Sequence, residues 1–399
     1  MNIENYISIN QLVLNFVGLY PISIARYIIC ISCILLIIIP LIAQICTNLE
    51  NLNILLETSS VLLTISLSIL KSFVWIFNRK NMEFLIHFML IDYWKIIKTD
   101  VFEHLQEYAI CAKNVTKGYL FLIINSLVFF YSVPIIEIFF TIIQDSTNNL
   151  TQKNFPFVAS YPLAFYNFPL YEITYVSQIL ATSICGLMIL ATDTLIATAV
   201  LHTCGHFKIL EENLKQINSN IYCVCMINSV ENNSKSISAN IYKIKIQVAC
   251  VIKHHQVILW FCDNMEKNFH VMLFLQTLAS SLIICFVGFQ ISTTLLVQTK
   301  LIRYFSHLMM ALFQLILFCF PGDILISKST SIYRAVYSIQ WYKLPTFIKS
   351  EVCMIMLRAQ KPSCITAGKI YVMHLENFSS TLSTALSYFM LLQSFNLET

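Results

Sequence analysis

Residues 380–399 read STLSTALSYFMLLQSFNLET, and from Leu382 to Phe395 this stretch is apolar enough to enter a membrane. Hydroxyl side chains recur along it at Ser380, Thr384, Ser387 and Ser394. Steps of four, three and then seven residues place these hydroxyls on one face of a helix, and the heptad position between the last two is Leu391. We therefore expect a membrane helix whose hydroxyl-rich stripe either packs against neighbouring helices or faces water.

The composition of the whole chain indicates an all-α membrane protein. Of its 399 residues, 57% are hydrophobic and only 12% are charged, and the mean hydropathy is +0.70. Seven Gly and nine Pro are too few for a loop-rich β protein. The fourteen cysteines do not indicate a disulfide framework, because several lie inside apolar runs, where a thiol behaves as a small hydrophobic group. A net charge of +4 is too weak to indicate a nucleic-acid partner.

Seven stretches approach or exceed the roughly 20 apolar residues that a bilayer requires. These spans 1 to 7 lie at about 27–46, 55–77, 119–143, 173–201, 269–298, 301–326 and 371–396. Spans 4 and 5 are long, so we expect their inner ends to continue beyond the lipid as helix.

The basic residues predict the orientation of the spans. Of the 25 Lys and Arg residues, 21 lie in the N-terminal segment or in the segments after spans 2, 4 and 6, whereas three lie on the opposite side. The remaining one, Lys71, lies near the inner end of span 2, where we expect it to snorkel toward water. The positive-inside rule therefore places the N-terminus in the cytoplasm and the C-terminus outside. The sequon at Asn149 is then extracellular, where it can be glycosylated.

This orientation argues against a G-protein-coupled receptor. That class also has seven spans, but its N-terminus is extracellular, so its basic loops would follow spans 1, 3 and 5. The chain also has no DRY-like triplet at the end of span 3 and no NPxxY motif in span 7.

The segments between spans 4 and 5 have amphipathic patterns. Leu210, Leu214 and Ile217 share one helical face, and after a polar stretch an apolar stripe resumes from Ile241 to Cys262. We expect helices that continue from spans 4 and 5 and pack together below the membrane. They would present an apolar surface suited to subunit assembly.

Four histidines raise the alternative of a metal site. His202 and His206 stand four residues apart on the expected helix, and His254 and His255 are adjacent. A membrane di-iron enzyme needs more clustered histidines than these. We therefore favour a packing role and expect no catalytic residue, no metal and no other cofactor.

Charged and aromatic residues within the spans are the candidate ligand-site residues. Glu137 and Asp193 are costly inside a bilayer and lie at different depths, so they are poor partners for one another; Glu137 either faces a cavity or is held structurally. Aromatic residues gather in the outer halves of spans 2, 3, 4 and 6, where they either anchor the interface or line a pocket for a small volatile molecule. Pro134 is expected to kink span 3 and to help open such a cavity. The candidates are Phe129, Phe130, Tyr131, Glu137, Tyr175, Gln178, Tyr304 and His307.

Several short motifs lie in the last 80 or so residues. They are Gly322-Asp323, Trp341-Tyr342 with Leu344-Pro345, Arg358 to Pro362, Thr366 to Lys369, Leu375-Glu376 with Phe378, and Ser387-Tyr388-Phe389. Together with LHTCGHFKIL at the end of span 4, they resemble the signature of insect odorant receptors. The ending of the related gustatory receptors is missed, because four apolar residues rather than five follow Tyr388. The enlarged loop that distinguishes the co-receptor is also missing, so the resemblance indicates a ligand-tuning subunit.

The resemblance implies an odorant-gated, non-selective cation channel in the plasma membrane of sensory neurons, formed as a tetramer with the co-receptor. It implies one receptor domain over 1–399, with a cytoplasmic N-terminus (1–26), spans 1 to 6 (27–326), a cytoplasmic anchor segment (327–370) and a pore-lining span 7 (371–396). A gustatory-type channel is the alternative within the same fold. The pore and gate candidates are Thr384, Ser387, Leu391, Ser394 and Phe395. A leucine ring in a wall of hydroxyls is suited to a gate that closes by dewetting.

Overall fold

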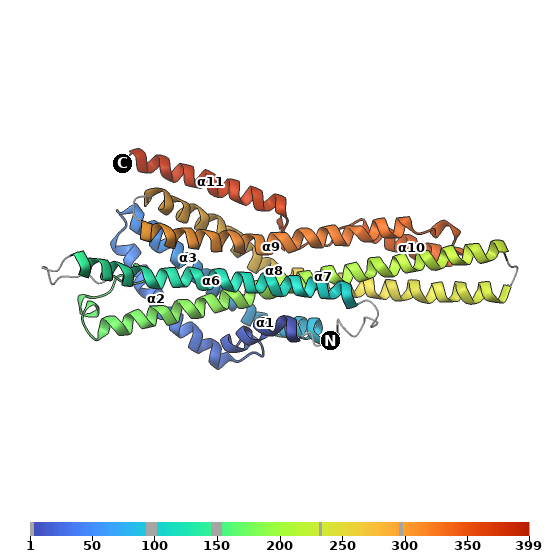
Figure 1. Cartoon of the computed structure of the whole chain (residues 1–399), viewed down its shortest axis with the longest axis horizontal. Coiled ribbons are helices and arrows are strands. Elements are labelled where there is room, and N and C mark those ends of the chain that lie inside the picture. Colours follow the sequence, from blue (N-terminus) through green and yellow to red (C-terminus); the bar gives the residue numbers. More distant parts are fainter. Residues whose placement is uncertain (1–3, 93–101, 145–153, 231–233, 295–297, 399) are drawn as a thin grey trace.

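The computed structural model describes residues 4–92, 102–144, 154–230, 234–294 and 298–398. Nearly all of them are helical, and the long helices run side by side in one elongated bundle (Figure 1). The predicted glycosylation site Asn149 lies outside the described residues.

Within the described residues, six helices are long and apolar enough to cross a bilayer. They are α2 (Ile24–Thr47), α3 (Leu52–Phe77), α6 (Phe102–Gln144), α7 (Leu170–Val230), α8 (Ser234–Thr293) and α9 (Gln298–Ser338). A seventh helix, α11 (Leu375–Glu398), has the length of a span but a sequence rich in hydroxyl residues. These seven helices follow the order of predicted spans 1 to 7, which confirms the all-α, seven-span fold.

Four helices are much longer than the spans that hydropathy marks. Helices α7 and α8 have 61 and 60 residues, and they project together beyond the rest of the bundle, as expected for spans 4 and 5 (Figure 1). Helix α9 does not end at residue 326 but continues to Ser338, and α10 (Thr346–Ala359) packs against it and α8. Helix α6 likewise begins at Phe102 rather than at residue 119. Hydropathy marks where a helix crosses lipid, whereas a helix that continues into water needs only an amphipathic sequence.

The N-terminal helix α1 (Glu4–Val17) buries one apolar face, which includes Ile7, Leu14 and Val17, against α7 and α6. It lies toward the end of the bundle from which α7 and α8 project, whereas α11 ends at the opposite end (Figure 1). An odd number of crossings requires this arrangement. We call these the inner and outer ends, following the predicted orientation. The remaining short helices are α4 (Arg79–His87), η1 (Phe88–Asp92), η3 (Leu163–Tyr166) and η4 (Trp341–Lys343).

A small β-hairpin precedes α11, so the prediction that span 7 begins at residue 371 is wrong. Strands β1 (Thr366–Ala367) and β2 (Tyr371–Val372) pair antiparallel across a turn in which Gly368 and Lys369 both have φ near +63°. Positive φ at both central positions is the conformation of a tight hairpin turn. The backbone N–H of Gly368 also donates to the His270 carbonyl of α8 at 2.8 Å, which fixes the hairpin to that helix.

After the hairpin, the chain passes very close to α9. A Cβ atom added to Gly322 would lie 2.1 Å from the carbonyl oxygen of Met373, two residues before α11 begins. Only glycine permits this approach of two backbones. The position ties the inner part of α9 to the start of the last helix.

Candidate ligand-binding site

A mainly apolar cavity of about 60 Å³ lies between α3, α6, α7 and α9. It has room for several water-sized groups, as a pocket for a small molecule requires. Its lining consists of Val61, Thr64 and Ile65 from α3, Ile123, Ser126, Leu127 and Phe130 from α6, Phe157 from the following segment, Thr182, Cys185, Gly186 and Ile189 from α7, and His307 and Met310 from α9.

On the outer side of this cavity lies a partly buried ion pair between Arg303 of α9 and Glu57 of α3, in which Arg303 is buried and Glu57 is 18% exposed. Each residue is four positions outward from a lining residue of its helix, His307 and Val61 respectively. Arg303 is 4% exposed, and its guanidinium lies 5.3 Å above the ring of Phe130. We call Glu57 and Arg303 the outer ion pair. It places both charges and a cation–π contact directly beside the cavity.

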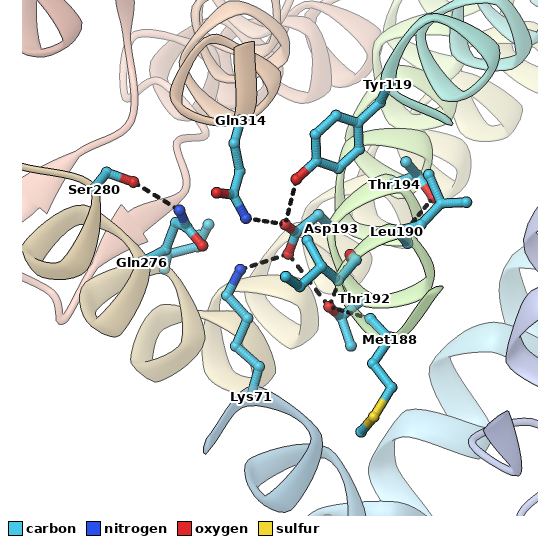
Figure 2. A network of polar contacts seen from close by, with 12 residues as sticks. Lys71, Tyr119, Met188, Leu190, Thr192, Asp193, Thr194, Gln276, Ser280 and Gln314 are labelled. Carbon is cyan, nitrogen blue, oxygen red and sulfur yellow. Dashed lines mark hydrogen bonds and ion pairs between the residues drawn. The ribbon is translucent and has the colours of Figure 1, made fainter. Parts of the chain in front are cut away.

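On the inner side lies a second buried polar group, centred on Asp193 of α7 (Figure 2). The ammonium of Lys71 (α3) donates to Asp193 Oδ1 at 2.6 Å, and Gln314 (α9) donates to Oδ2 at 2.6 Å. The hydroxyl of Tyr119 (α6) donates to Oδ2 at 3.5 Å. The Thr192 hydroxyl lies 3.3 Å from Oδ1, but the Met188 carbonyl of its own helix is nearer, at 3.0 Å. We call these five residues the inner polar network. It joins the same four helices that form the cavity, about one helical turn further inward.

The prediction that Lys71 snorkels toward water is therefore wrong. Lys71 is 1% exposed and Asp193 is 0% exposed. A buried charge is tolerated when it is paired and hydrogen-bonded, and Asp193 supplies that pairing from a helix more than a hundred residues away. The expectation that Asp193 and Glu137 do not pair agrees with this geometry, since Glu137 accepts a hydrogen bond from Asn154 Nδ2 at 3.1 Å.

Two of the candidate ligand-binding residues, Phe130 and His307, line the cavity. The ring of Phe130 stacks on Phe157 with centroids 4.9 Å apart. The rings of Phe130 and His307 meet edge to face, with centroids 5.9 Å apart. His307 Nε2 lies 3.4 Å from the hydroxyl of Thr64. Phe157 was not predicted, because it comes from a segment between spans that hydropathy does not mark.

Three other candidates lie behind the wall and hold it in place. The Tyr131 hydroxyl bonds to Thr182 Oγ1 at 2.8 Å, and the Tyr175 hydroxyl donates to the Tyr131 carbonyl at 2.6 Å. The side-chain oxygen Oε1 of Gln178 accepts from the backbone N–H of Phe157 at 3.1 Å, which fixes the Phe157 ring over the cavity. These residues position lining groups without lining the cavity themselves.

The last three candidates also lie away from the lining. Tyr304 is buried and accepts a bond from Arg303 at 3.0 Å, so it belongs with the outer ion pair. Phe129 is half-buried, and Glu137 is bonded to Asn154 as described. The predicted aromatic residues thus surround this cavity, but only two of the eight candidates line it.

Helix α11 lies at the edge of the bundle (Figure 1) and packs on α8 and α9 through a face that includes Thr381 and Ala385. Its predicted stripe of Thr384, Ser387, Leu391 and Ser394 is exposed. The three hydroxyls donate to backbone carbonyls of their own helix at 2.8–3.0 Å. The stripe therefore does not pack inside this chain. The side chain of Phe395 lies outside the described residues.

The clustered histidines lie in the inner extensions of α7 and α8. His206 Nδ1 and His254 Nε2 are 3.1 Å apart, and burial lowers the pKa of His254 to about 4 and that of His206 well below its usual value. Within the described residues, no three His, Cys, Asp or Glu side chains converge as metal ligands do.

A seven-helix membrane bundle with a mainly apolar cavity among four of its helices is the architecture expected of a small-molecule receptor. The chain belongs to the 7tm Odorant receptor family, whose sequence model matches residues 51–386. It is thus a multi-pass membrane receptor and not an enzyme. This assignment decides against the G-protein-coupled receptor, gustatory-type and di-iron alternatives.

Individual relatives agree with the family assignment. The chain is 29% identical over 285 residues to Odorant receptor 13a of Drosophila melanogaster. This alignment covers 67% of this chain and 63% of that protein. It is 26% identical over 141 residues to the Odorant receptor coreceptor of Aedes aegypti, covering 35% and 30%. The chain thus spans less than two thirds of the length of these curated relatives. In fold the chain is similar to the insect olfactory receptor OR5 from Machilis hrabei, which was solved in complex with eugenol. The TM-score is 0.73, the match covers 94% of this chain and 90% of OR5, and the sequence identity is 15%.

Proposed function

We propose that this chain is the odorant-tuning subunit of a non-selective cation channel, which it forms with the odorant co-receptor in the plasma membrane of a sensory neuron. Membership of the 7tm Odorant receptor family supports the channel assignment. The similarity to Odorant receptor 13a covers 67% of the chain and that to the co-receptor only 35%, which favours a tuning subunit.

The cavity between α3, α6, α7 and α9 is the observation on which this proposal rests. Its lining is apolar apart from a few hydroxyl, thiol and imidazole groups, so it suits a small volatile molecule. The solved complex of the similar receptor OR5 with eugenol supports a small organic ligand. Such a ligand opens the channel only if it binds the open arrangement of these helices more tightly than the closed one.

Helix α11 is proposed as the pore-lining helix. Its hydroxyl stripe is exposed in the single chain, and a wall of hydroxyls with one leucine is the pattern of a pore that closes at a hydrophobic ring. Residues 327–370, with the inner extensions of α7 and α8, are proposed as the cytoplasmic anchor through which subunits assemble. A tetramer is the expected assembly.

The test is to record odorant-evoked currents from cells that express the chain with the co-receptor, the chain alone, or the co-receptor alone. A Ser126→Phe variant fills the cavity, and we expect it to abolish responses to odorants while a direct co-receptor agonist still opens the channel. The control is Ile124→Phe, a change of similar size at a position of the same helix that is 50% exposed. No current with a broad volatile panel in the presence of the co-receptor would refute the proposal.

A further inference from the structure

One cavity-lining side chain, His307, has an unusual hydrogen-bonding state. It lies on α9, is 4% exposed, and approaches Thr64 Oγ1 with its Nε2 atom at 3.4 Å. The Thr64 hydroxyl in turn lies 2.9 Å from the backbone carbonyl of Ser60, one turn earlier on α3. These two contacts fix the position of the imidazole proton.

A hydroxyl group has one proton to donate. The Thr64 proton is directed at the Ser60 carbonyl, which can only accept, so the Thr64 oxygen acts as an acceptor toward His307. Nε2 must then be the protonated nitrogen of a neutral ring, and Nδ1 keeps a free lone pair. Among the described residues, Nδ1 has no hydrogen-bond partner, although it is fully buried.

A buried acceptor without a donor is costly, and a ligand that supplies a donor removes the cost. Among the other hydroxyls of the lining, that of Thr182 already donates to the backbone carbonyl of Gln178 at 2.7 Å. Ser126 also lines the cavity, and a variant of this residue is compared below. A cationic donor is disfavoured because an ammonium group would lose its hydration in a mainly apolar cavity, and the carboxylate beside that cavity, Glu57, is already paired with Arg303.

We propose that the ligand of this cavity is a small apolar molecule with a hydroxyl group, an alcohol or a phenol, whose O–H donates to Nδ1 of His307. The proposal rests on the odorant-receptor function proposed above and specifies its ligand class. Aldehydes, ketones, esters and ethers of the same size lack the donor. Aliphatic amines are protonated near neutral pH and bring a positive charge into this mainly apolar cavity.

The test compares four probes with the same number of non-hydrogen atoms: n-hexanol, hexanal, methyl pentyl ether and n-hexylamine. Binding is measured as the ligand-induced rise in the thermal unfolding midpoint of the purified complex with the co-receptor. Evoked current is measured separately in cells. We expect n-hexanol to bind roughly tenfold more tightly than the ether and the aldehyde, the effect of one buried hydrogen bond, and n-hexylamine to bind more weakly than n-hexanol.

Variants of one residue separate this hydrogen bond from packing. His307→Phe keeps a ring but removes the acceptor, so the affinity for n-hexanol is expected to fall roughly tenfold, to that for the ether. His307→Asn keeps a carbonyl acceptor near the position of Nδ1, although its shorter side chain gives up the contact that Nε2 makes with Thr64. It is expected to preserve the preference even if the Phe variant does not fold. The control Ile65→Val enlarges the cavity without a polar change and should alter the four affinities alike.

Four outcomes would overturn the proposal. Hexanal binding more tightly than n-hexanol would mean that the opposite tautomer is present. A preference for n-hexanol that survives in His307→Phe but is lost in Ser126→Ala would assign the hydrogen bond to Ser126, another lining residue. Binding of none of the four probes would also reject it. Equal binding of the probes with evoked currents would reject the hydroxyl preference alone, whereas selective binding without any current would reject the channel function alone.

Discussion

Replacing Asp193 with asparagine is expected to destabilise the bundle more than any other single change in the inner polar network. The substitution preserves the shape of the side chain but removes its charge. Lys71, which is 1% exposed and donates to Asp193 at 2.6 Å, then has no buried anion within hydrogen-bonding distance among the described residues. The ammonium must remain charged in an apolar bundle or lose its proton, and both states cost free energy.

The magnitude follows from what each single variant leaves behind. Removing one partner of a buried ion pair typically costs about 3–5 kcal/mol, and we expect Asp193→Asn to lie in this range. Lys71→Met should cost less, because Gln314 and Tyr119 still donate to the remaining carboxylate. The double variant contains neither charge. We expect it to be more stable than Asp193→Asn, with a coupling free energy of roughly 2–3 kcal/mol.

The assay is the thermal unfolding midpoint of the tagged full-length chain in detergent, followed by fluorescence-detected size exclusion. Unfolding of a membrane protein is often irreversible, so the order of the midpoints is the result, rather than a free energy. The expected order from highest to lowest is wild type, the double variant, Lys71→Met and Asp193→Asn. A double variant that unfolds at or below the midpoint of Asp193→Asn would show additive losses and refute the pairing.

Three further changes test other parts of the molecule. Leu391→Ser is expected to produce a resting cation leak without odorant in cells that express the co-receptor. The control Leu386→Ser, at a similarly exposed position off the stripe, should produce no leak. An unchanged resting conductance in Leu391→Ser would reject the gate. Gly322→Ala places a Cβ atom 2.1 Å from a backbone carbonyl, so it is expected to lower the free energy of unfolding by about 1–3 kcal/mol and to weaken odorant activation. The control is Gly118→Ala, whose Cβ atom would meet its nearest neighbour at 3.9 Å and should change neither measurement. Because burial lowers the pKa of His254 from 6.5 to about 4, the unfolded chain binds the proton at a higher pH than the folded chain does. The stability that depends on neutral His254 is therefore fully present above about pH 6.5 and is lost as the pH falls toward 4. His254→Gln should show a smaller fall in unfolding midpoint over this range. A wild-type midpoint that is flat over this range would contradict the buried neutral state.

The sequence predicted the spans well where lipid sets the length of a helix. Predicted spans 27–46 and 55–77 differ from α2 and α3 by at most three residues at either end. The start of α11 was placed four residues too early, because Tyr371 and Val372 are apolar and only the positive φ of the preceding turn shows that they form a strand. Hydropathy contains no information on backbone dihedral angles.

The site was less predictable, because it depends on how each helix is rotated about its axis. Phe130 and its neighbour Tyr131 have similar hydropathy patterns, yet one lines the cavity and the other supports its wall. The buried charges were visible in the sequence, but the partner of Lys71 was not. An ion pair between α3 and α7 is fixed by tertiary packing, which a single sequence without covarying positions does not reveal.

The two polar groups on either side of the cavity suggest how ligand binding reaches the proposed pore. Helix α9 contributes Arg303 to the outer ion pair, His307 to the cavity and Gln314 to the inner polar network. These contacts hold α9 at three successive levels, so a ligand that changes the spacing of the four helices is expected to displace the part of α9 from Arg303 to Gln314 as a unit. Two turns further inward, Gly322 lies against the backbone of Met373, where any such displacement meets the start of α11. We infer that this contact couples the cavity to α11, which is why Gly322→Ala is expected to weaken activation by odorant; normal activation in a well-folded Gly322→Ala variant would rule out this route.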